Sequence, residues 1–164
     1  MRNIAYLSLG SNIGDRAQSL RQAIARLETK NCRVVQVSSF YETEPVEFTD
    51  QAWFLNCAVE VETSLTPAEL MAALLAIEHS MGRERIQKKG PRIIDLDILL
   101  YGDTIIDTPD LTIPHPAMTH RRFVLGPLAE IAPEAVHPIR RKTVGELLSE
   151  MPEGQAVKKL SNSI

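Results

Sequence analysis

Two aspartates stand two residues apart in an otherwise apolar segment, Ile-Ile-Asp-Leu-Asp-Ile-Leu-Leu-Tyr at residues 93–101. The composition and length of the segment predict a β-strand, in which successive side chains point to opposite faces. Asp95 and Asp97 therefore share one face, with Cα atoms about 6.5 to 7 Å apart. Both carboxylates could then reach one or two shared cations, and such hard oxygen ligands favour Mg²⁺ completed by phosphate oxygens. The alternative is an exposed sheet face whose acids pair with Lys or Arg. The other face of the strand is expected to carry Ile94, Leu96, Ile98 and Leu100.

A basic segment lies directly before the two acids. Residues 83–92 carry five basic side chains against one acid, a local charge of +4, and since the whole chain has a net charge of −3 the remainder carries −7. This acidic background disfavours non-specific nucleic-acid binding. A small polyanion held by the basic segment is compatible with it, because arginine is a bidentate phosphate ligand. The alternative is a solvated loop or helix end. The basic residues are Arg83, Arg85, Lys88, Lys89 and Arg92.

The composition of the chain limits the class of protein. Its 164 residues, 44% hydrophobic and 24% charged, fit one domain at residues 1–164 and no membrane span. Cys32 and Cys57 form no Cys-x-x-Cys motif, which argues against a disulfide scaffold or a zinc knuckle. The chain starts without an export leader, so we expect a cytoplasmic protein. Phosphate-binding glycine motifs of the P-loop and dinucleotide-fold types are missing.

The order of predicted elements indicates an α+β fold. The order β-α-β-β-α-β of the predicted strands and helices indicates a ferredoxin-like core, in which an antiparallel sheet has its helices on one face and an active-site cleft on the other. A Pro-rich helical C-terminal extension is expected to follow. The predicted elements are a strand at 4–9 with a turn at 10–14, a helix from Asp15, strands at 34–41 and 54–61, a helix from a Thr66/Glu69 capping box to Met81, the strand at 93–101, and helices near 123–131 and 143–150.

The segment Lys88-Lys89-Gly90-Pro91-Arg92-Ile93-Ile94-Asp95-Leu96-Asp97-Ile98-Leu99 resembles the signature of the 6-hydroxymethyl-7,8-dihydropterin pyrophosphokinase family. Further similarity lies in Gly10-Ser11-Asn12, Ser38-Ser39-Phe40-Tyr41, Phe54-Leu55-Asn56, Gly82-Arg83 and Ile113-Pro114-His115-Pro116, so the resemblance covers roughly residues 4–138. It implies transfer of pyrophosphate from MgATP to the hydroxymethyl group of the pterin in folate biosynthesis, with release of AMP.

The resemblance also implies roles for individual residues. Asp95 and Asp97 match the ligands of two Mg²⁺ ions, and Arg83 and Arg92 match arginines of a loop that closes over the site. The positions that match contacts of ATP are Glu78, Arg83, Arg85, Arg92, Ile98, Thr112, His115 and Arg121. Those that match the pterin pocket are Thr43, Pro45, Val46, Phe54, Asn56 and Phe123.

Alternative readings remain open for several of these residues. His115 stands between two prolines and could be a turn histidine bonded to the backbone, while Phe54 and Phe123 could be ordinary core residues. Asn56 is harder to explain that way, because a buried amide without partners is costly.

The expected partners are small molecules, ATP and the pterin, without nucleic acid or membrane, and the enzyme is expected to be a monomer. Two other functions are compatible with the residues. One is a Mg²⁺-dependent phosphohydrolase that uses the same acids on water. The other is a ligand-binding ferredoxin-like domain that catalyses nothing.

Overall fold

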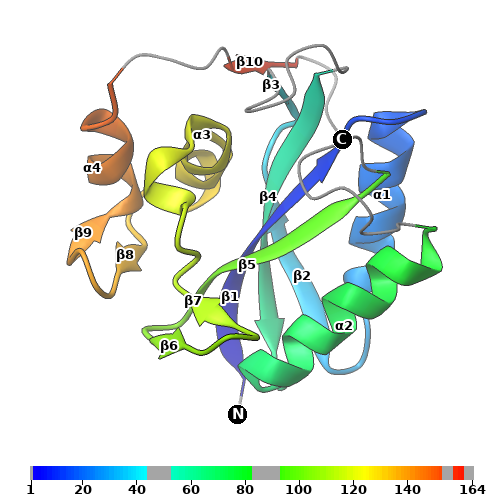
Figure 1. The fold of residues 1–164 in the computed structure, drawn as a ribbon, viewed down its shortest axis with the longest axis horizontal. Coiled ribbons are helices and arrows are strands. Elements are labelled where there is room, and N and C mark those ends of the chain that lie inside the picture. The colour runs from blue at the N-terminus through cyan, green and yellow to red at the C-terminus, as the bar shows by residue number, and fades with distance from the viewer. Residues whose placement is uncertain (1, 44–52, 83–92, 153–156, 161–164) are drawn as a thin grey trace.

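An antiparallel sheet lies between two pairs of helices in the computed structural model, which describes residues 2–43, 53–82, 93–152 and 157–160 (Figure 1). All strand pairs of this sheet are antiparallel. In spatial order the strands are β10 (Val157–Lys159), β3 (Tyr41–Thr43), β4 (Phe54–Thr63), β1 (Asn3–Ser11) and β5 (Asp95–Tyr101), and β2 (Cys32–Val37) also pairs with β4. The strand with the two aspartates is therefore at an edge of the sheet.

Helices α1 (Arg16–Leu27) and α2 (Pro67–Ser80) cover one face of the sheet (Figure 1). Each begins at the side-chain cap that the sequence predicts. The Asp15 carboxylate accepts the backbone N–H of Gln18 at 3.1 Å, and Thr66 forms a complete capping box with Glu69. Such caps satisfy N–H groups that have no partner within the helix. Helices α3 (Arg122–Ile131) and α4 (Val144–Ser149) lie over the opposite face.

Each face of the sheet has its own hydrophobic cluster. The cluster under α1 and α2 includes Leu7, Leu9, Leu20, Leu74, Leu96 and Ile98. The cluster under α3 and α4 includes Ala58, Leu99, Leu100, Val124, Leu125 and Leu147. Helices α3 and α4 thus occupy part of the face on which we expected the cleft.

The segment at 34–41, predicted as one strand, forms two. It runs as β2 to Val37, breaks, and resumes as β3 at Tyr41. The break arises because Ser38 forms two hydrogen bonds with the backbone of Ala58, one of them through its side chain. Its backbone N–H donates to the Ala58 carbonyl at 2.9 Å, and its hydroxyl accepts the Ala58 N–H at 2.8 Å. Phe40 is then buried in the core. Both pieces still pair with β4.

Two other expectations about strands need correction. Gly10 and Ser11 are not in a turn but end β1, where they pair with Asn56 and Leu55. Leu100 does not share a face with Ile98, because the pairing of β1 with β5 shifts by one residue: Leu7 pairs with Ile98, but Tyr6 pairs with Leu100. This bulge places Leu100 in the cluster under α3.

Three short elements follow β5 that the sequence did not predict. They are the hairpin of β6 (Ile106–Asp107) with β7 (Thr112–Ile113), the 3₁₀ turn η1 (Met118–His120), and the hairpin of β8 (Val136–His137) with β9 (Lys142–Thr143).

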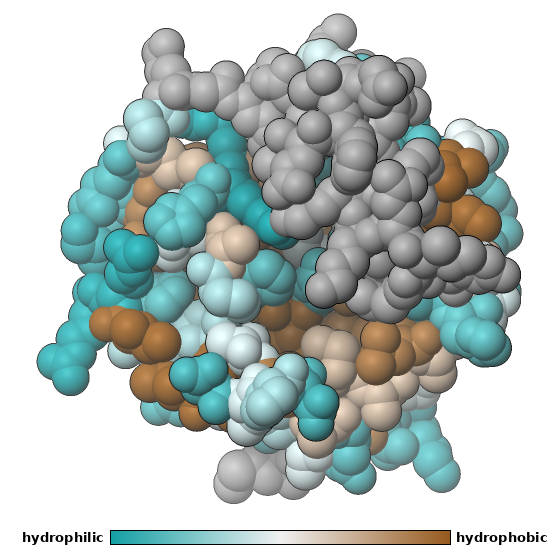
Figure 2. Space-filling model, viewed as in Figure 1, coloured by the Kyte–Doolittle hydropathy of each residue, from teal (hydrophilic) through white to brown (hydrophobic). Residues whose placement is uncertain are grey.

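Hydrophobic surface gathers at the β8–β9 side and beside α2, with hydrophilic residues around it (Figure 2). Among the described residues no helix has the length and apolar character needed to cross a bilayer.

Candidate active site

The two aspartates lie on the sheet face that points away from α1 and α2. Asp95 and Asp97 are half-buried, whereas Leu96 and Ile98, which alternate with them, are 1% and 2% exposed in the core under those helices. The alternation of β5 therefore separates the carboxylates from the apolar side chains as predicted. On the neighbouring strand, Asp95 faces Gly10 and Asp97 faces Ser8.

A buried amide lies in the same row of the sheet as Asp95. Gly10 pairs with Asp95 on one side and with Asn56 of β4 on the other. Adjacent strands are about 4.8 Å apart, which puts the Cα atoms of Asp95 and Asn56 about 10 Å apart across the glycine. The carboxylates and the amide thus border a common strip of the sheet surface.

The side chain of Asn56 is held by Thr43. Its Nδ2 donates to Thr43 Oγ1 at 2.6 Å, and both residues are buried, 4% and 1% exposed. A Cβ atom on Gly10 would lie only 2.6 Å from Asn56 Oδ1 and 3.5 Å from Phe54 Cδ1. The missing side chain of Gly10 is therefore what lets the amide and the Phe54 ring occupy this position. Phe54 itself is half-buried, in contrast to a fully enclosed core residue.

A hollow of about 220 Å³ opens beside the acids. Four of the predicted site residues line it, and these are Asp97, Ile98, Thr112 and His115. Met71 of α2, Pro109, Leu111 and Pro116 form the rest of the apolar part of its wall, and Asp110 also lines it. Residues from β5, β7 and the following loop thus meet at one place, although they are up to 18 residues apart in the chain.

His115 has a rigid and uncharged place in this wall. Its Nδ1 accepts the backbone N–H of Ala117 at 3.1 Å, and its own backbone N–H donates to the carbonyl of Leu99 at 3.0 Å. Burial lowers the pKa of the imidazole from 6.5 to about 4, and the Arg121 guanidinium adds to this effect, while Asp95 opposes it. The reading as a turn histidine bonded to the backbone is thus confirmed, and it coexists with a place in the wall of the hollow. At neutral pH the ring is neutral, so its remaining N–H is a donor without a charge.

Arg121 and Phe123 flank the start of α3. The Arg121 guanidinium carbon is 5.5 Å from the centre of the Phe123 ring, a distance that allows a cation–π contact. Phe123 is half-buried and packs against the cluster under α3 and α4. Part of the ring thus serves the core, as in the alternative reading, and part remains accessible.

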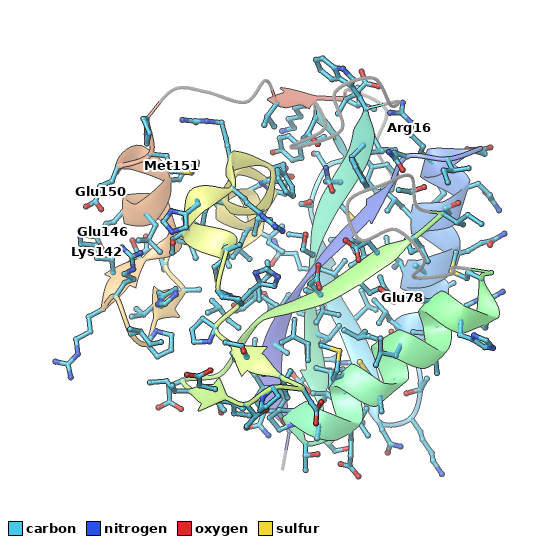
Figure 3. All side chains as sticks on the ribbon, viewed as in Figure 1. Arg16, Glu78, Lys142, Glu146, Glu150 and Met151 are labelled. Carbon is cyan, nitrogen blue, oxygen red and sulfur yellow. The ribbon has the colours of Figure 1, made fainter. Side chains whose placement is uncertain are left out.

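Glu78 lies apart from the hollow. It is 2% exposed in the last turn of α2, and its Oε2 accepts the backbone N–H of Leu96 at 2.7 Å (Figure 3). This bond puts the carboxylate between α2 and β5.

The remaining predicted positions cannot be placed in this arrangement. Arg83, Arg85, Arg92, Pro45 and Val46 lie outside the described residues. Within the described ranges no group of three or more His, Cys, Asp or Glu side chains is arranged to hold a metal ion. Two carboxylates on one open face suit a cation such as Mg²⁺, which keeps several waters and takes other oxygen ligands from phosphates. They are too few for a metal site whose ligands all come from the protein.

Sequence reasoning missed two features of this site. It rated Gly10 as a turn residue, although only the pairing of β1 with β4 reveals the contact with Asn56. It also did not name Met71, Leu111 and Pro116 as lining residues. The spacing of four between Leu70, Leu74 and Glu78 was a usable signal that Glu78 faces the core.

Comparison with known proteins identifies the family. The family model described as 7,8-dihydro-6-hydroxymethylpterin-pyrophosphokinase (HPPK) matches residues 6–133. The chain belongs to this family. A 2-amino-4-hydroxy-6-hydroxymethyldihydropteridine pyrophosphokinase of Bacillus subtilis is 55% identical over 132 residues, which are 80% of this chain and 79% of that protein.

The chain is also similar to parts of longer proteins. The folic acid synthesis protein fol1 of Schizosaccharomyces pombe is 45% identical over 150 residues, 91% of this chain but only 20% of that protein. A crystal structure of Plasmodium falciparum HPPK-DHPS with pterin and p-hydroxybenzoate superposes with a TM-score of 0.74 at 20% identity, covering 92% of this chain and 42% of that one. At this identity the superposition supports the fold alone.

Proposed function

We propose that this HPPK chain transfers the diphosphate group of ATP to the hydroxymethyl oxygen of 6-hydroxymethyl-7,8-dihydropterin, giving AMP and the pterin diphosphate for folate biosynthesis. Membership of the family supports this activity. The observation that carries it is the row Asp95, Gly10 and Asn56 across three strands. In this row the Cα atoms of Asp95 and Asn56 are about 10 Å apart, and we infer that the acid serves a metal-bound polyphosphate and the amide a pterin edge.

The acids define the end of the site where transfer would occur. Asp95 and Asp97 would hold two Mg²⁺ ions, which neutralise phosphate charge and lower the pKa of a coordinated hydroxyl. The hydroxymethyl oxygen would form a bond to the β-phosphorus, the bond from that phosphorus to the oxygen of the α-phosphate would break to release AMP, and the hydroxyl proton would pass to water. No described side chain is needed as a base, since positioning and charge neutralisation lower the barrier. His115 is uncharged near pH 7 and would donate an N–H to a phosphate oxygen.

The amide end of the site suits the pterin. Because Thr43 takes one Nδ2 hydrogen of Asn56, the amide keeps one hydrogen and its Oδ1 in a fixed orientation. A donor beside an acceptor is complementary to the edge of a pterin ring. Phe54 and Phe123 are half-buried, and each would offer an aromatic face to the ring. Pro45 and Val46 would complete this pocket from the segment between β3 and β4.

The hollow beside Asp97 suits the nucleotide. Ile98 and Thr112 would border adenine, and His115 with Arg121 would contact the triphosphate. Arg83, Arg85 and Arg92 would close over the phosphates and exclude water. Glu78 was expected among the ATP contacts, but its bond to Leu96 favours a different role.

The same reading extends to the whole chain. The sheet order β5-β1-β4-β2, with α1 and α2 on one face, supports a ferredoxin-like core, and the elements after β5 would form its Pro-rich extension. We propose that residues 1–164 act as one domain, as a monomeric cytoplasmic enzyme.

One assay separates this function from its rivals. Protein, MgATP and hydroxymethyldihydropterin are mixed, each is omitted in turn, and AMP is measured. We expect AMP only in the complete mixture. A phosphohydrolase would consume ATP without the pterin, and a ligand-binding domain would form no AMP.

The matched variants are Asp97→Asn and Asp103→Asn. Asp103 is exposed in the turn after β5, so its variant tests the loss of a carboxylate elsewhere. We expect Asp97→Asn to lose AMP formation by at least a hundredfold with an unchanged circular dichroism spectrum, and Asp103→Asn to behave as the parent. Full activity of Asp97→Asn at ordinary Mg²⁺ concentration would refute the metal role of the acids.

A further inference from the structure

Glu78 is a buried carboxylate in a stripe of leucines. The buried residues of α2 are Leu70, Leu74 and Glu78, four apart, so they lie on one side of the helix toward the core. Removing a carboxylate from water is costly unless hydrogen bonds compensate it. A leucine at this position would continue the stripe at no such cost. The acid therefore has a task that an apolar side chain could not perform.

The bond of Glu78 reaches the backbone between the two aspartates. Its Oε2 accepts the N–H of Leu96 at 2.7 Å, and Leu96 separates Asp95 from Asp97. Among the described strands, β5 pairs only with β1. The outward N–H groups of such an edge strand would otherwise bond to water. The carboxylate oxygen of a helix residue instead accepts the hydrogen of this one amide.

Fixing that amide also fixes the neighbouring side chains. In a strand, the plane of one peptide sets the directions in which the residues before and after it project. Leu96 is held on both sides, by its buried side chain and by the carboxylate on its N–H. Asp95 and Asp97 therefore project from a backbone that is anchored between them, which restrains the directions of their Cα–Cβ bonds.

We propose that Glu78 is a positioning residue for the acid pair: its carboxylate oxygen holds the Leu96 N–H and so preorganises Asp95 and Asp97 for metal binding. The proposal rests on the metal role of those acids proposed above. It requires an acceptor atom at this place and not a negative charge. A contact of Glu78 with nucleotide or cation would require the charge instead.

Two substitutions separate acceptor from charge. Glu78→Gln keeps an oxygen at the same reach and removes the charge, whereas Glu78→Asp keeps the charge and withdraws the oxygen by one methylene. Leu74→Val is the control for lost stability, since Leu74 is fully buried one turn earlier on the same stripe.

The first measurement is hydrogen exchange of the Leu96 amide in protein free of metal and nucleotide. We expect exchange in Glu78→Asp to be at least tenfold faster than in the parent, with Glu78→Gln close to the parent. The second is the affinity for Mg²⁺ in the complex with α,β-methylene ATP, followed by calorimetry. We expect it to fall about tenfold in Glu78→Asp, and to change less than threefold in Glu78→Gln and in Leu74→Val.

The opposite pattern overturns the proposal. If Glu78→Gln loses Mg²⁺ affinity while Glu78→Asp keeps it, the charge matters and Glu78 acts on the ligand. If Leu96 exchanges faster in Glu78→Asp but Mg²⁺ binds normally, the bond is structural only. Failure of the metal site itself gives a separate signature, because Asp97→Asn would then also bind Mg²⁺ as the parent does.

Discussion

Replacement of Gly10 by alanine tests the arrangement of the proposed pterin end. The new Cβ would lie 2.6 Å from Asn56 Oδ1, about 0.8 Å inside the ordinary contact limit of 3.4 Å. The amide cannot retreat freely, because its other end is held at 2.6 Å by Thr43. Either that hydrogen bond breaks or β1 and β4 move apart.

The size of the effect follows from the hydrogen bonds at stake. A buried polar group left without its partner costs about 1 to 3 kcal/mol. Since 1.4 kcal/mol is a factor of about ten in an equilibrium constant, displacement of the Asn56 amide should weaken pterin binding by about 10- to 100-fold. Nucleotide binding should change little, because no residue of the hollow beside Asp97 is touched by the new methyl group.

The assay is calorimetric titration of the pterin into protein saturated with α,β-methylene ATP, with separate titration of the nucleotide. Gly126→Ala in α3 is the matched control, since a Cβ there meets no atom within 4 Å other than those of its chain neighbours and of the backbone of its own helix. That variant should bind the pterin normally.

A double-mutant cycle decides whether the effect acts through the amide. In an Asn56→Ala background, Gly10→Ala should weaken pterin binding less than twofold further, because the atom it displaces is already gone. Pterin binding by Gly10→Ala at the parental affinity would refute the reasoning, as would a full additional loss in the double variant.

Three further outcomes are expected. The imidazole of His115 has a pKa of about 4 in the folded protein against 6.5 in the unfolded chain, so it binds its proton more tightly when unfolded. The free energy of unfolding should therefore fall by about 2 to 3 kcal/mol as pH drops from 6.5 to 4. An NMR titration that gives His115 a pKa near 6.5 in the folded protein would contradict this. Glu130 accepts the N–H and hydroxyl of Ser39 and the hydroxyl of Tyr41, so Glu130→Ala should lower the free energy of unfolding in urea by about 1 kcal/mol, whereas Glu134→Ala, which changes an exposed glutamate after α3, should not. Burial raises the pKa of the Cys57 thiol, so this thiol should resist thiol reagents in the native protein and react within seconds in denaturant. Rapid labelling of the folded protein would instead show that β4 opens readily.

The local parts of the fold could be predicted because their causes are local. The capping box of Thr66 with Glu69 and the periodicity after it define α2 without reference to the rest of the molecule. The same holds for the alternation that puts Asp95 and Asp97 on one face. Both patterns express the geometry of a single helix or strand.

The features that escaped prediction depend on pairing between distant segments. Gly10 meets Asn56 only through the register of β1 with β4. The break at Ser38 depends on the backbone of Ala58, and the hollow beside Asp97 depends on the short hairpin that brings Thr112 to β5. No property of one segment reveals such contacts.

Because of the one-residue bulge in β5, this strand contributes side chains to both hydrophobic clusters. Before the bulge, Asp95 and Asp97 lie on one face of the strand and Leu96 and Ile98 pack in the core under α1 and α2, and after it, Leu100 packs in the cluster under α3. The proposed metal ligands and the residue that packs against the C-terminal helices therefore follow one another along the same strand. Deleting Leu99 would remove the bulge and leave Ile98 paired with Leu7 and Leu100 paired with Tyr6, so Leu100 and the aspartates would keep their faces while the second core would lose the Leu99 side chain.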